Sequence, residues 1–336
     1  MRNEPFFSVI VPVYNGPSER QDLLDSLLGQ THRDFEVIVV EDGSTEPCRT
    51  IVEQAAAKGL DARYFFKENE GRSIARNYGM ERAAGAYFVF FDSDCVVPPQ
   101  YFGELARELE ESPLDCFGGP DAAHASFSPK QKAINYAMTS FLTTGGIRGG
   151  KVSLEKFTPR TFNMGFSREV YRRIGGFREM FSEDIDMSTR IRRGGYSIGL
   201  YRSVFVWHKR RVDFRKFARQ VYVFGMSRIT LHLLYPGSLK TVHILPAMFV
   251  LGMVASLVLA VAVSPWWLLP PALYFAAIFT GALESTRSPR IAALAVPASA
   301  IQLGGYGCGF LRAWFSKILL RRGRDVEQEI KMRKGK

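Results

Sequence analysis

Two carboxylates one residue apart, Asp92 and Asp94, follow an apolar run at residues 87–91. Such a run is typical of a buried strand. In an open α/β sheet, ligands bind in the crevice outside the carboxyl ends of the strands. Two carboxylates there suit Mg²⁺ or Mn²⁺, which keep some waters and take further oxygens from phosphates. The alternative interpretation is a solvated turn that binds nothing.

A second acidic pair, Glu183 and Asp184, opens a helical pattern. A carboxylate in such a place can act as a general base that takes a proton from an attacking hydroxyl group. The alternative is that acids in the first turn of a helix only offset its dipole. Asp186 and Arg190 are spaced i, i+4, so we expect them to pair on the helix.

The elements that must position these acids alternate along the chain between apolar runs and amphipathic segments. This alternation predicts an α/β fold with a doubly wound, mostly parallel sheet. The loops after the first, second and fourth strands then meet at one edge and bring Tyr14, Asp42 and the Asp92/Asp94 pair together. We expect strands at residues 7–14, 35–40, 63–66 and 87–91, and helices at residues 18–29, 45–59 and 73–85.

The residues gathered in this way could bind a nucleotide. The ring of Tyr14 can stack on a nucleobase, and Asp42 can accept a hydrogen bond from a base N–H. Arg72 and Arg76 follow Gly71 at a helix start, where cations and the helix N-terminus favour phosphate. The alternatives are ordinary turn and cap roles for Tyr14 and Asp42, and a solvated helix face for Arg76.

Four segments, in this order, resemble the motifs of the family 2 glycosyltransferases with the GT-A fold. They are Ser8-Val-Ile-Val-Pro-Val-Tyr-Asn, Val39-Val-Glu-Asp-Gly-Ser-Thr, Gly71-Arg-Ser-Ile-Ala-Arg-Asn and Phe91-Asp-Ser-Asp. The resemblance covers about residues 6–230 and implies a nucleotide-sugar donor, a divalent cation and inversion at the anomeric carbon. Glu41 departs from the pattern, because the family usually has a second Asp there.

Carried onto this sequence, the resemblance implies nucleoside contacts at Pro12, Tyr14 and Asp42. It implies that Asp92 and Asp94 form the family's Asp-x-Asp motif, whose second acid is the expected ligand of Mn²⁺ or Mg²⁺. We therefore expect Asp92 to contact both the donor and the metal ion.

The acceptor side follows from the same resemblance. Glu183-Asp184 matches the family's Glu-Asp motif, which implies that Asp184 is the base and Glu183 an acceptor-side or structural partner. Asn163, Met164 and Gly165 resemble the segment that leads to the acceptor, so we expect them to line the sugar pocket; the alternative is a buried strand. His208, at the end of an expected strand, resembles an additional metal or diphosphate ligand of some members, against the alternative of a surface or packing residue.

The last third of the chain has a membrane pattern. Residues 241–283 contain no Asp, Glu, Lys or Arg, and as helix they extend roughly 65 Å, enough for a hairpin of two passes. A further apolar run, 291–311, contains Pro297, Gln302 and a glycine cluster, so we expect a re-entrant or interfacial segment. We predict a cytosolic catalytic domain at 1–212, an interfacial amphipathic helix region at 213–240, a membrane-embedded region at 241–311 and a basic tail at 312–336.

The net charge of +11 is concentrated beside these apolar runs. Residues 209–219 contain six basic residues against one acid, and residues 312–336 contain nine against three. Positive charge that flanks apolar spans indicates the cytoplasmic side and anionic membrane lipid, and it disfavours a nucleic-acid partner. The four cysteines have no metal or disulfide spacing. We find no signal-peptide pattern, so we expect the cytoplasmic (inner) membrane, with the catalytic domain facing the cytosol.

The acceptor can be narrowed by its chemistry. Relatives that resemble dolichyl-phosphate mannose synthase use an anionic lipid phosphate and lack the Glu-Asp motif, whereas this chain has Glu183-Asp184. We therefore favour a hydroxyl of a lipid or lipid-linked saccharide, a UDP-sugar donor and cell-envelope glycan or glycolipid synthesis. Because the Gln-x-x-Arg-Trp motif of processive synthases is absent after Gln220, we expect transfer of one sugar. The alternatives are a polyprenyl-phosphate glycosyltransferase and a non-catalytic scaffold that binds nucleotide sugars.

Overall fold

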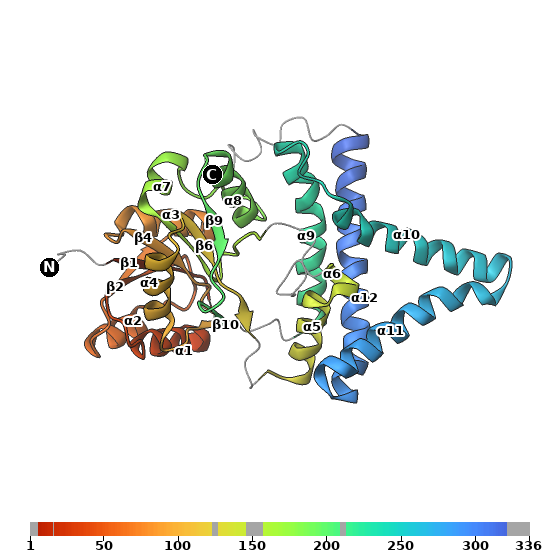
Figure 1. Ribbon diagram of the computed structural model, residues 1–336, viewed down its shortest axis with the longest axis horizontal. Helices are drawn as coiled ribbons and strands as arrows, with labels where there is room; N and C mark the ends of the chain where they lie inside the picture. Colours follow the sequence, from red (N-terminus) through yellow and green to blue (C-terminus); the bar gives the residue numbers. More distant parts are fainter. Residues whose placement is uncertain (1–5, 16, 123–126, 146–156, 209–212, 321–336) are drawn as a thin grey trace. The chain divides into compact units, whose positions relative to one another are not determined.

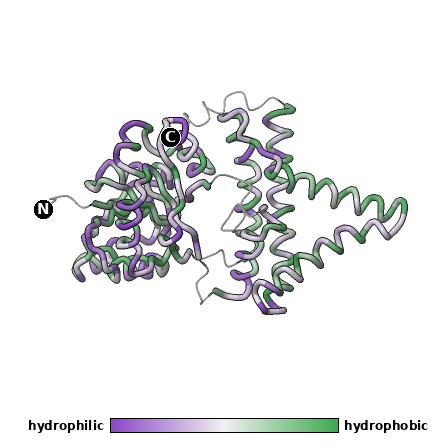
Figure 2. Tube along the Cα trace, viewed as in Figure 1, coloured by the Kyte–Doolittle hydropathy of each residue, from purple (hydrophilic) through white to green (hydrophobic). Residues whose placement is uncertain are grey.

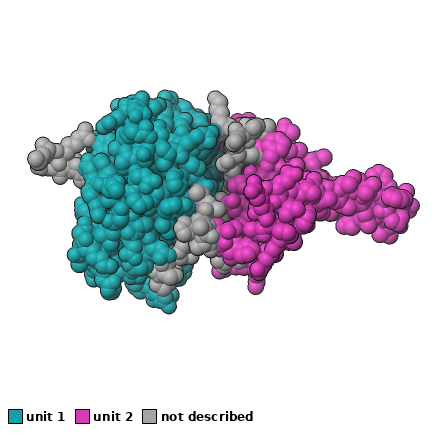
Figure 3. All heavy atoms as spheres, turned by 60° about the horizontal axis from the view of Figure 1, so that its bottom comes forward, with its two compact units in different colours: residues 1–124, 157–209, 332–336 teal, residues 125–156, 210–331 magenta. Residues whose placement is uncertain are grey.

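The computed structural model of the protein describes residues 6–15, 17–122, 127–145, 157–208 and 213–320. The chain forms two compact units (Figure 3). The first contains residues 1–124, 157–209 and 332–336, and the second contains residues 125–156 and 210–331. We expected 1–212 to form one continuous domain, but the segment 125–156 belongs to the second unit. The functional boundaries stay a prediction.

The first unit is built on a seven-stranded sheet in the order β3-β2-β1-β4-β8-β6-β9 (Figure 1). Strands β3, β2, β1 and β4 are parallel, whereas β8 is antiparallel to both of its neighbours. The strands are β1 (Phe7–Val13), β2 (Phe35–Asp42), β3 (Ala62–Lys67), β4 (Tyr87–Phe90), β6 (Cys116–Gly118), β8 (Met164–Ser167) and β9 (Ile198–Leu200). The predicted doubly wound, mostly parallel sheet is therefore confirmed.

Helices cover both faces of this sheet because successive strand residues point to opposite sides. In β1, Val9 and Val11 pack in a core with α1, α2 and α4, while Ile10 packs in a second core with α3, α7 and α8. These helices are α1 (Pro17–Leu28), α2 (Arg49–Ala57), α3 (Arg72–Arg82), α4 (Tyr101–Glu111), α7 (Arg168–Ile174) and α8 (Glu183–Arg193). The predicted strands and helices of residues 7–91 are all present, with ends that differ by a few residues.

A small second sheet lies directly after the Asp-Ser-Asp segment. Its order is β5-β10-β7, with β10 (Val206–His208) antiparallel to β5 (Cys95–Val96) and parallel to β7 (Asp121–Ala122). This pairing fixes the chain that leaves Asp94, since Cys95 lies opposite His208.

The second unit is helical. Among its described residues, three helical segments are long and apolar enough to cross a membrane, namely Thr241–Ala262, Pro265–Thr286 and Pro289–Leu319. Figure 2 shows hydrophobic residues along most of α10 and α11. The elements are α5 (Pro129–Thr139), α6 (Phe141–Thr144), α9 (Phe214–Leu234), α10 (Thr241–Ala262), η1 (Pro265–Leu268), α11 (Leu269–Thr286), α12 (Pro289–Ala313) and η2 (Trp314–Leu319).

Helix α12 runs without a break through Pro297 and the glycine cluster, and the predicted re-entrant placement of this segment stays a prediction. The glycines allow close helix packing instead of ending the helix. A Cβ at Gly309 would lie 2.0 Å from the carbonyl oxygen of Tyr222 in α9, and one at Gly307 would lie 2.2 Å from that of Pro246 in α10. A position in the membrane interface stays a prediction.

Helix α9 was expected to lie in the membrane interface, against the alternative of a core helix of the catalytic domain. In the structure, Phe217 and Val221 of that side are buried against Ile134 and Ala137 of α5 and Ala298 of α12. Neighbouring helices thus cover much of the apolar surface that we expected to contact lipid. The predicted interfacial position is then supported by the basic side chains of α9 alone.

Candidate active site

The loops predicted to form the site follow three neighbouring strands, β1, β2 and β4. These strands are parallel, so their carboxyl ends lie at one edge of the sheet. Tyr14 follows β1, Asp42 ends β2, and Asp92 and Asp94 follow β4. The topology therefore brings the predicted donor-side residues to the same edge.

Tyr14 is 57% exposed at this edge, and Pro12 before it is half-buried in β1. The backbone beside Tyr14 is held in place. Asn15 donates its N–H to Ser44 Oγ at 2.8 Å, and the N–H of Thr45 donates to Asn15 Oδ1 at 3.0 Å. An exposed aromatic ring on a fixed loop can stack on a nucleobase.

Asp42 organises the loop that leads into α3. Its Oδ1 accepts from Lys67 Nζ at 2.8 Å and from the N–H of Glu70 at 3.0 Å, and its Oδ2 accepts from the N–H of Gly71 at 2.9 Å. Burial lowers the pKa of Lys67, but the Asp42 and Glu70 carboxylates raise it by more, so the net shift is upward. Asp42 thus has a structural role beside the nucleoside contact that we expected.

Asp92 and Asp94 are both half-buried in the loop between β4 and β5. Across the described part of the chain, no group of three or more His, Cys, Asp or Glu side chains could hold a metal ion by itself. Two carboxylates still fit Mg²⁺ or Mn²⁺, because these ions complete their shells with water and phosphate oxygens.

Cys95 follows this acidic pair but is a poor metal ligand. Burial raises the pKa of its thiol well above the ordinary value, and the charges of Asp94 and Asp92 raise it further. The thiolate is the form that binds metal, and in this structure the Cys95 thiol instead donates to the carbonyl oxygen of Phe162 at 3.5 Å.

Arg76 lies between the two acidic motifs. Its side chain is fully buried, with Nη2 2.7 Å from Asp92 Oδ1 and Nη1 3.0 Å from Glu183 Oε1. We expected Arg76 to contact a donor phosphate. In this structure its guanidinium group is instead engaged by two protein carboxylates, and the contact with phosphate stays a prediction.

Arg72 pairs with the same glutamate but remains 53% exposed. Its Nε lies 3.0 Å from Glu183 Oε1, and its Nη2 donates to Glu183 Oε2 at 3.0 Å. Desolvation lowers the pKa of Arg72, but the charges of Glu183, Asp92 and Asp184 raise it by more, and the net shift is upward. Arg72 is therefore the charged arginine that can still reach a phosphate.

Asp184 is the more accessible acid of the second pair. Its side chain is 13% exposed, against 2% for Glu183. Arg160 Nη1 lies 3.2 Å from Asp184 Oδ2, and the N–H of Ile185 donates to Asp184 Oδ1 at 2.8 Å. These contacts hold Asp184 in one orientation at the first turn of α8, as a positioned base requires.

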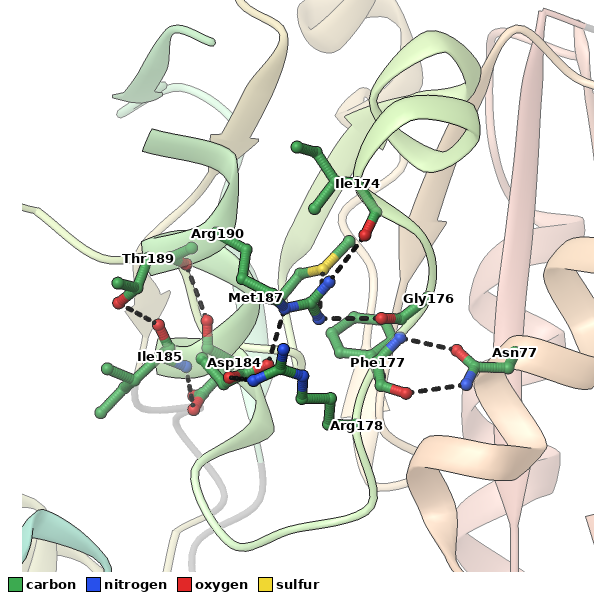
Figure 4. Close-up of polar contacts among 12 residues, drawn as sticks. Asn77, Ile174, Gly176, Phe177, Arg178, Asp184, Ile185, Met187, Thr189 and Arg190 are labelled. Atoms are coloured by element: carbon green, nitrogen blue, oxygen red, sulfur yellow. Dashed lines mark hydrogen bonds and ion pairs between the residues drawn. The ribbon is translucent and has the colours of Figure 1, made fainter. Parts of the chain in front are cut away.

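The loop between α7 and α8, which positions Asp184, is fastened from both sides (Figure 4). Asn77 of α3 exchanges two hydrogen bonds of 2.8 Å with the backbone of Phe177. Arg190 of α8 donates to the carbonyl oxygens of Ile174 at 3.0 Å and Gly176 at 2.8 Å. Arg190 also pairs with Asp186 at 2.9 Å, which confirms the predicted i, i+4 pair.

Two further residues of this loop are unusual. Glu179 Oε2 accepts from the N–H of Ser73 at 3.2 Å, and burial, aided by the charge of Glu183, raises the pKa of Glu179. Ser182, directly before Glu183, has φ 64° and ψ 40°, a left-handed conformation that is rare outside glycine. The chain enters the Glu-Asp pair through a strained residue.

The segment that was predicted to line the sugar pocket is buried in the protein. Asn163 is buried: its Oδ1 accepts from the Tyr101 hydroxyl at 2.6 Å, and its Nδ2 donates to the carbonyl oxygen of Val204 at 2.9 Å. Met164 lies in the core, and a Cβ at Gly165 would lie 2.2 Å from the ring of Phe117 in β6. Their contacts are those of the buried strand alternative, so we leave them out of the site.

His208 was predicted as an additional metal or diphosphate ligand. Its backbone lies at the end of β10 and pairs with Cys95. Its side chain lies outside the described part of the structure, so this prediction stays open.

Arg160, Glu179 and Asn77 were missed by sequence reasoning. Arg160 directly precedes the Thr-Phe-Asn-Met-Gly segment, so its place in the sequence could have marked it as an acceptor-side residue. Asn77 and Phe177 are 100 residues apart in the chain, and no local pattern could have paired them.

Comparisons with known proteins agree with this architecture. Residues 8–175 match the model of Glycosyl transferase family 2. The uncharacterized glycosyltransferase EpsJ of Bacillus subtilis is 31% identical over 185 residues, 54% of this chain and 52% of that protein. The uncharacterized glycosyltransferase YibD of Escherichia coli is 36% identical over 108 residues, 32% of this chain and 31% of that protein. The match thus spans about half the length of the first relative and a third of the second.

Among solved structures, mannosyltransferase PcManGT from Pyrobaculum calidifontis, in complex with GDP-Man and Mn²⁺, is similar. The similarity covers 95% of this chain and 88% of that one, with a TM-score of 0.56 and 20% identity. At this identity the likeness shows the fold alone, and it agrees with the predicted GT-A class.

Proposed function

Because the chain belongs to glycosyl transferase family 2, we propose that it moves one sugar from a nucleoside diphosphate sugar to a hydroxyl group, with inversion at the anomeric carbon. A UDP-sugar is the favoured donor. The acceptor is a hydroxyl of a lipid or lipid-linked saccharide in cell-envelope glycan or glycolipid synthesis.

The observation that carries this proposal is the linkage of the two acidic motifs through Arg76. One buried guanidinium group contacts Asp92 at 2.7 Å and Glu183 at 3.0 Å. A metal-binding acid and a general base must lie on opposite sides of one reacting carbon, and this contact holds their two segments close together.

In the proposed reaction, Tyr14 and Pro12 contact the nucleoside, with Asp42 holding the adjacent loop. The exposed edge of Arg72 faces the diphosphate. Asp184 accepts the proton of the acceptor hydroxyl as its oxygen attacks the anomeric carbon, and the bond to the diphosphate breaks. The base fits a hydroxyl acceptor better than a polyprenyl phosphate, which is already an anion.

Asp94 and Asp92 would hold Mn²⁺ or Mg²⁺. When bound, the cation neutralises charge on the diphosphate leaving group. The two carboxylates are hard oxygen donors of the kind that these ions prefer.

The second unit supports a place at the membrane. Three apolar helices could anchor the protein there, and we propose the cytoplasmic (inner) membrane with a cytosolic catalytic domain. Anionic lipid is the partner that the basic residues at 209–219 favour.

A donor screen tests the proposal. Purified protein with Mn²⁺ and a membrane lipid extract is offered a set of nucleoside diphosphate sugars, and release of the nucleoside diphosphate is measured. We expect release from one donor, dependent on extract and abolished by EDTA. Equal transfer to polyprenyl phosphate alone would favour the alternative acceptor, and release from none of the donors would contradict the proposal.

A further inference from the structure

Four charged side chains form one network, buried at its centre, between α3, α8 and the loop after β4. They are Arg72, Arg76, Asp92 and Glu183. Two positive and two negative charges balance, as buried ionic groups require. Arg76 is the centre of this network, since only Arg76 contacts both carboxylates.

The burial of these residues differs in an informative way. The side chains of Arg76 and Glu183 are 0% and 2% exposed, whereas Asp92 is 33% exposed. Nε of Arg76 is buried and has no hydrogen-bond partner within the described chain. Glu183 therefore cannot reach a ligand directly, while the exposed part of Asp92 can.

The charge on Arg76 is shared between its two partners. The Glu183 carboxylate balances part of that charge and leaves Asp92 free to attract a cation. Without the charge of Glu183, the Nη groups of Arg76 would have Asp92 as their one anionic partner, and Asp92 would bind a cation more weakly.

We propose that Arg76 is a positioning residue that couples Glu183 to Asp92, so that the first residue of α8 sets the strength of cation binding at the Asp-Ser-Asp loop. This coupling rests on the proposed function for its catalytic meaning. It gives Glu183 a role distinct from that of its neighbour Asp184, which pairs with Arg160.

Titration of the purified full chain with Mn²⁺ alone, following free Mn²⁺ by electron paramagnetic resonance, tests the coupling. Glu183→Gln is expected to raise the Kd of Mn²⁺ about tenfold, a usual size for coupling between sites. Asp184→Asn removes the same charge one residue away and is the matched control, with a change below about threefold. When Arg76→Gln is already present, adding Glu183→Gln is expected to change the Kd of Mn²⁺ no more than Asp184→Asn does.

Equal effects of Glu183→Gln and Asp184→Asn on the Kd would overturn the coupling while the glycosyltransferase proposal stands. If the Arg76→Gln protein does not fold, the comparison of Glu183→Gln with Asp184→Asn is sufficient to test the coupling.

If the parent chain binds no Mn²⁺ at this loop, the metal-dependent function fails, and amide exchange without ligand tests the coupling. Asp92→Asn should then speed exchange at least fivefold in the first turn of α8, where Asp34→Asn, a change at a distant acid, should not. Unchanged exchange in α8 would overturn the coupling.

Discussion

In the first unit, α3 and α8 are joined by ion pairs, from Arg72 and Arg76 to Glu183. In the second unit, α9 and α12 are joined at glycines, with the position of a Cβ at Gly309 only 2.0 Å from the carbonyl oxygen of Tyr222. Both contacts are between helices far apart in the sequence. One depends on long charged side chains, and the other on the absence of any side chain.

The difference teaches that residue type alone is a poor guide to role. Arg76 looked like a ligand-binding residue and is buried as a link between protein carboxylates. The glycine cluster of α12 looked like a helix breaker and is a packing surface. The charged contact can respond to a bound ion, whereas the glycine contact depends on backbone fit alone.

The largest effect on stability is expected from Arg76→Ala. Removing one partner of a buried ionic network leaves Asp92 and part of the charge of Glu183 uncompensated, at a cost of about 3–5 kcal/mol in the free energy of unfolding. Arg72→Ala, at a half-exposed position, is expected to cost at most about 1 kcal/mol, because solvent screens exposed ion pairs. Denaturant unfolding of both variants measures this, and equal losses would contradict the central place of Arg76.

Gly309→Ala should cost about 2–3 kcal/mol in the unfolding of the helical unit, because the new methyl group would meet backbone of α9 that cannot move aside. Gly304→Ala is the matched control, since a Cβ there has nothing within 4 Å. Alanine favours the helix, so the control is expected to be neutral or more stable by up to about 1 kcal/mol. Thermal unfolding in detergent compares the two, and a tolerated Gly309→Ala would refute the close packing.

Asn77→Ala should cost about 2 kcal/mol, since both of its hydrogen bonds to Phe177 are lost. The loop before Asp184 is then released, so we also expect lower turnover. Hydrogen exchange over residues 174–182 reports on the loop, with Gln21→Ala, at a half-buried position of α1, as control. Unchanged exchange would show that Arg190 fastens the loop alone.

The smallest effect concerns Glu179, whose pKa is raised by burial. A carboxyl group with a raised folded pKa contributes stability below its ordinary pKa, and this contribution is lost as pH rises through the folded value. Glu179→Gln removes that loss, so its stability relative to the parent should increase by less than about 1 kcal/mol between pH 4 and pH 7. Unfolding free energies across this range test the sign, and a relative decrease would contradict it.

The sequence predicted the sheet of the first unit well, because each of its first four strands is a continuous apolar run bounded by turn residues. Because these strands are parallel, the loops after their carboxyl ends lie at one edge of the sheet. Tyr14, Asp42 and Asp92 are in these loops and therefore lie at that edge, as expected. The Asp186–Arg190 pair was predicted because it depends only on helical spacing.

What could not be predicted depends on distant contacts. The burial of Arg76 and Asn163 arises from α8, α4 and the loops around them, none of which is local to those residues. The insertion of residues 125–156 into the helical unit is likewise set by packing of α5 against α12, which leaves no local signature.

The central claim is that Asp184 is the catalytic base. The turnover number of an Asp184→Asn variant tests this claim most directly. Asp184→Asn is compared with Asp186→Asn, the neighbouring acid that pairs with Arg178 and Arg190, each normalised to folded protein. We predict that Asp184→Asn lowers kcat by about 10²–10⁴-fold with donor binding unchanged, whereas Asp186→Asn loses stability but keeps its turnover. A kcat for Asp184→Asn within about threefold of the parent would contradict the account.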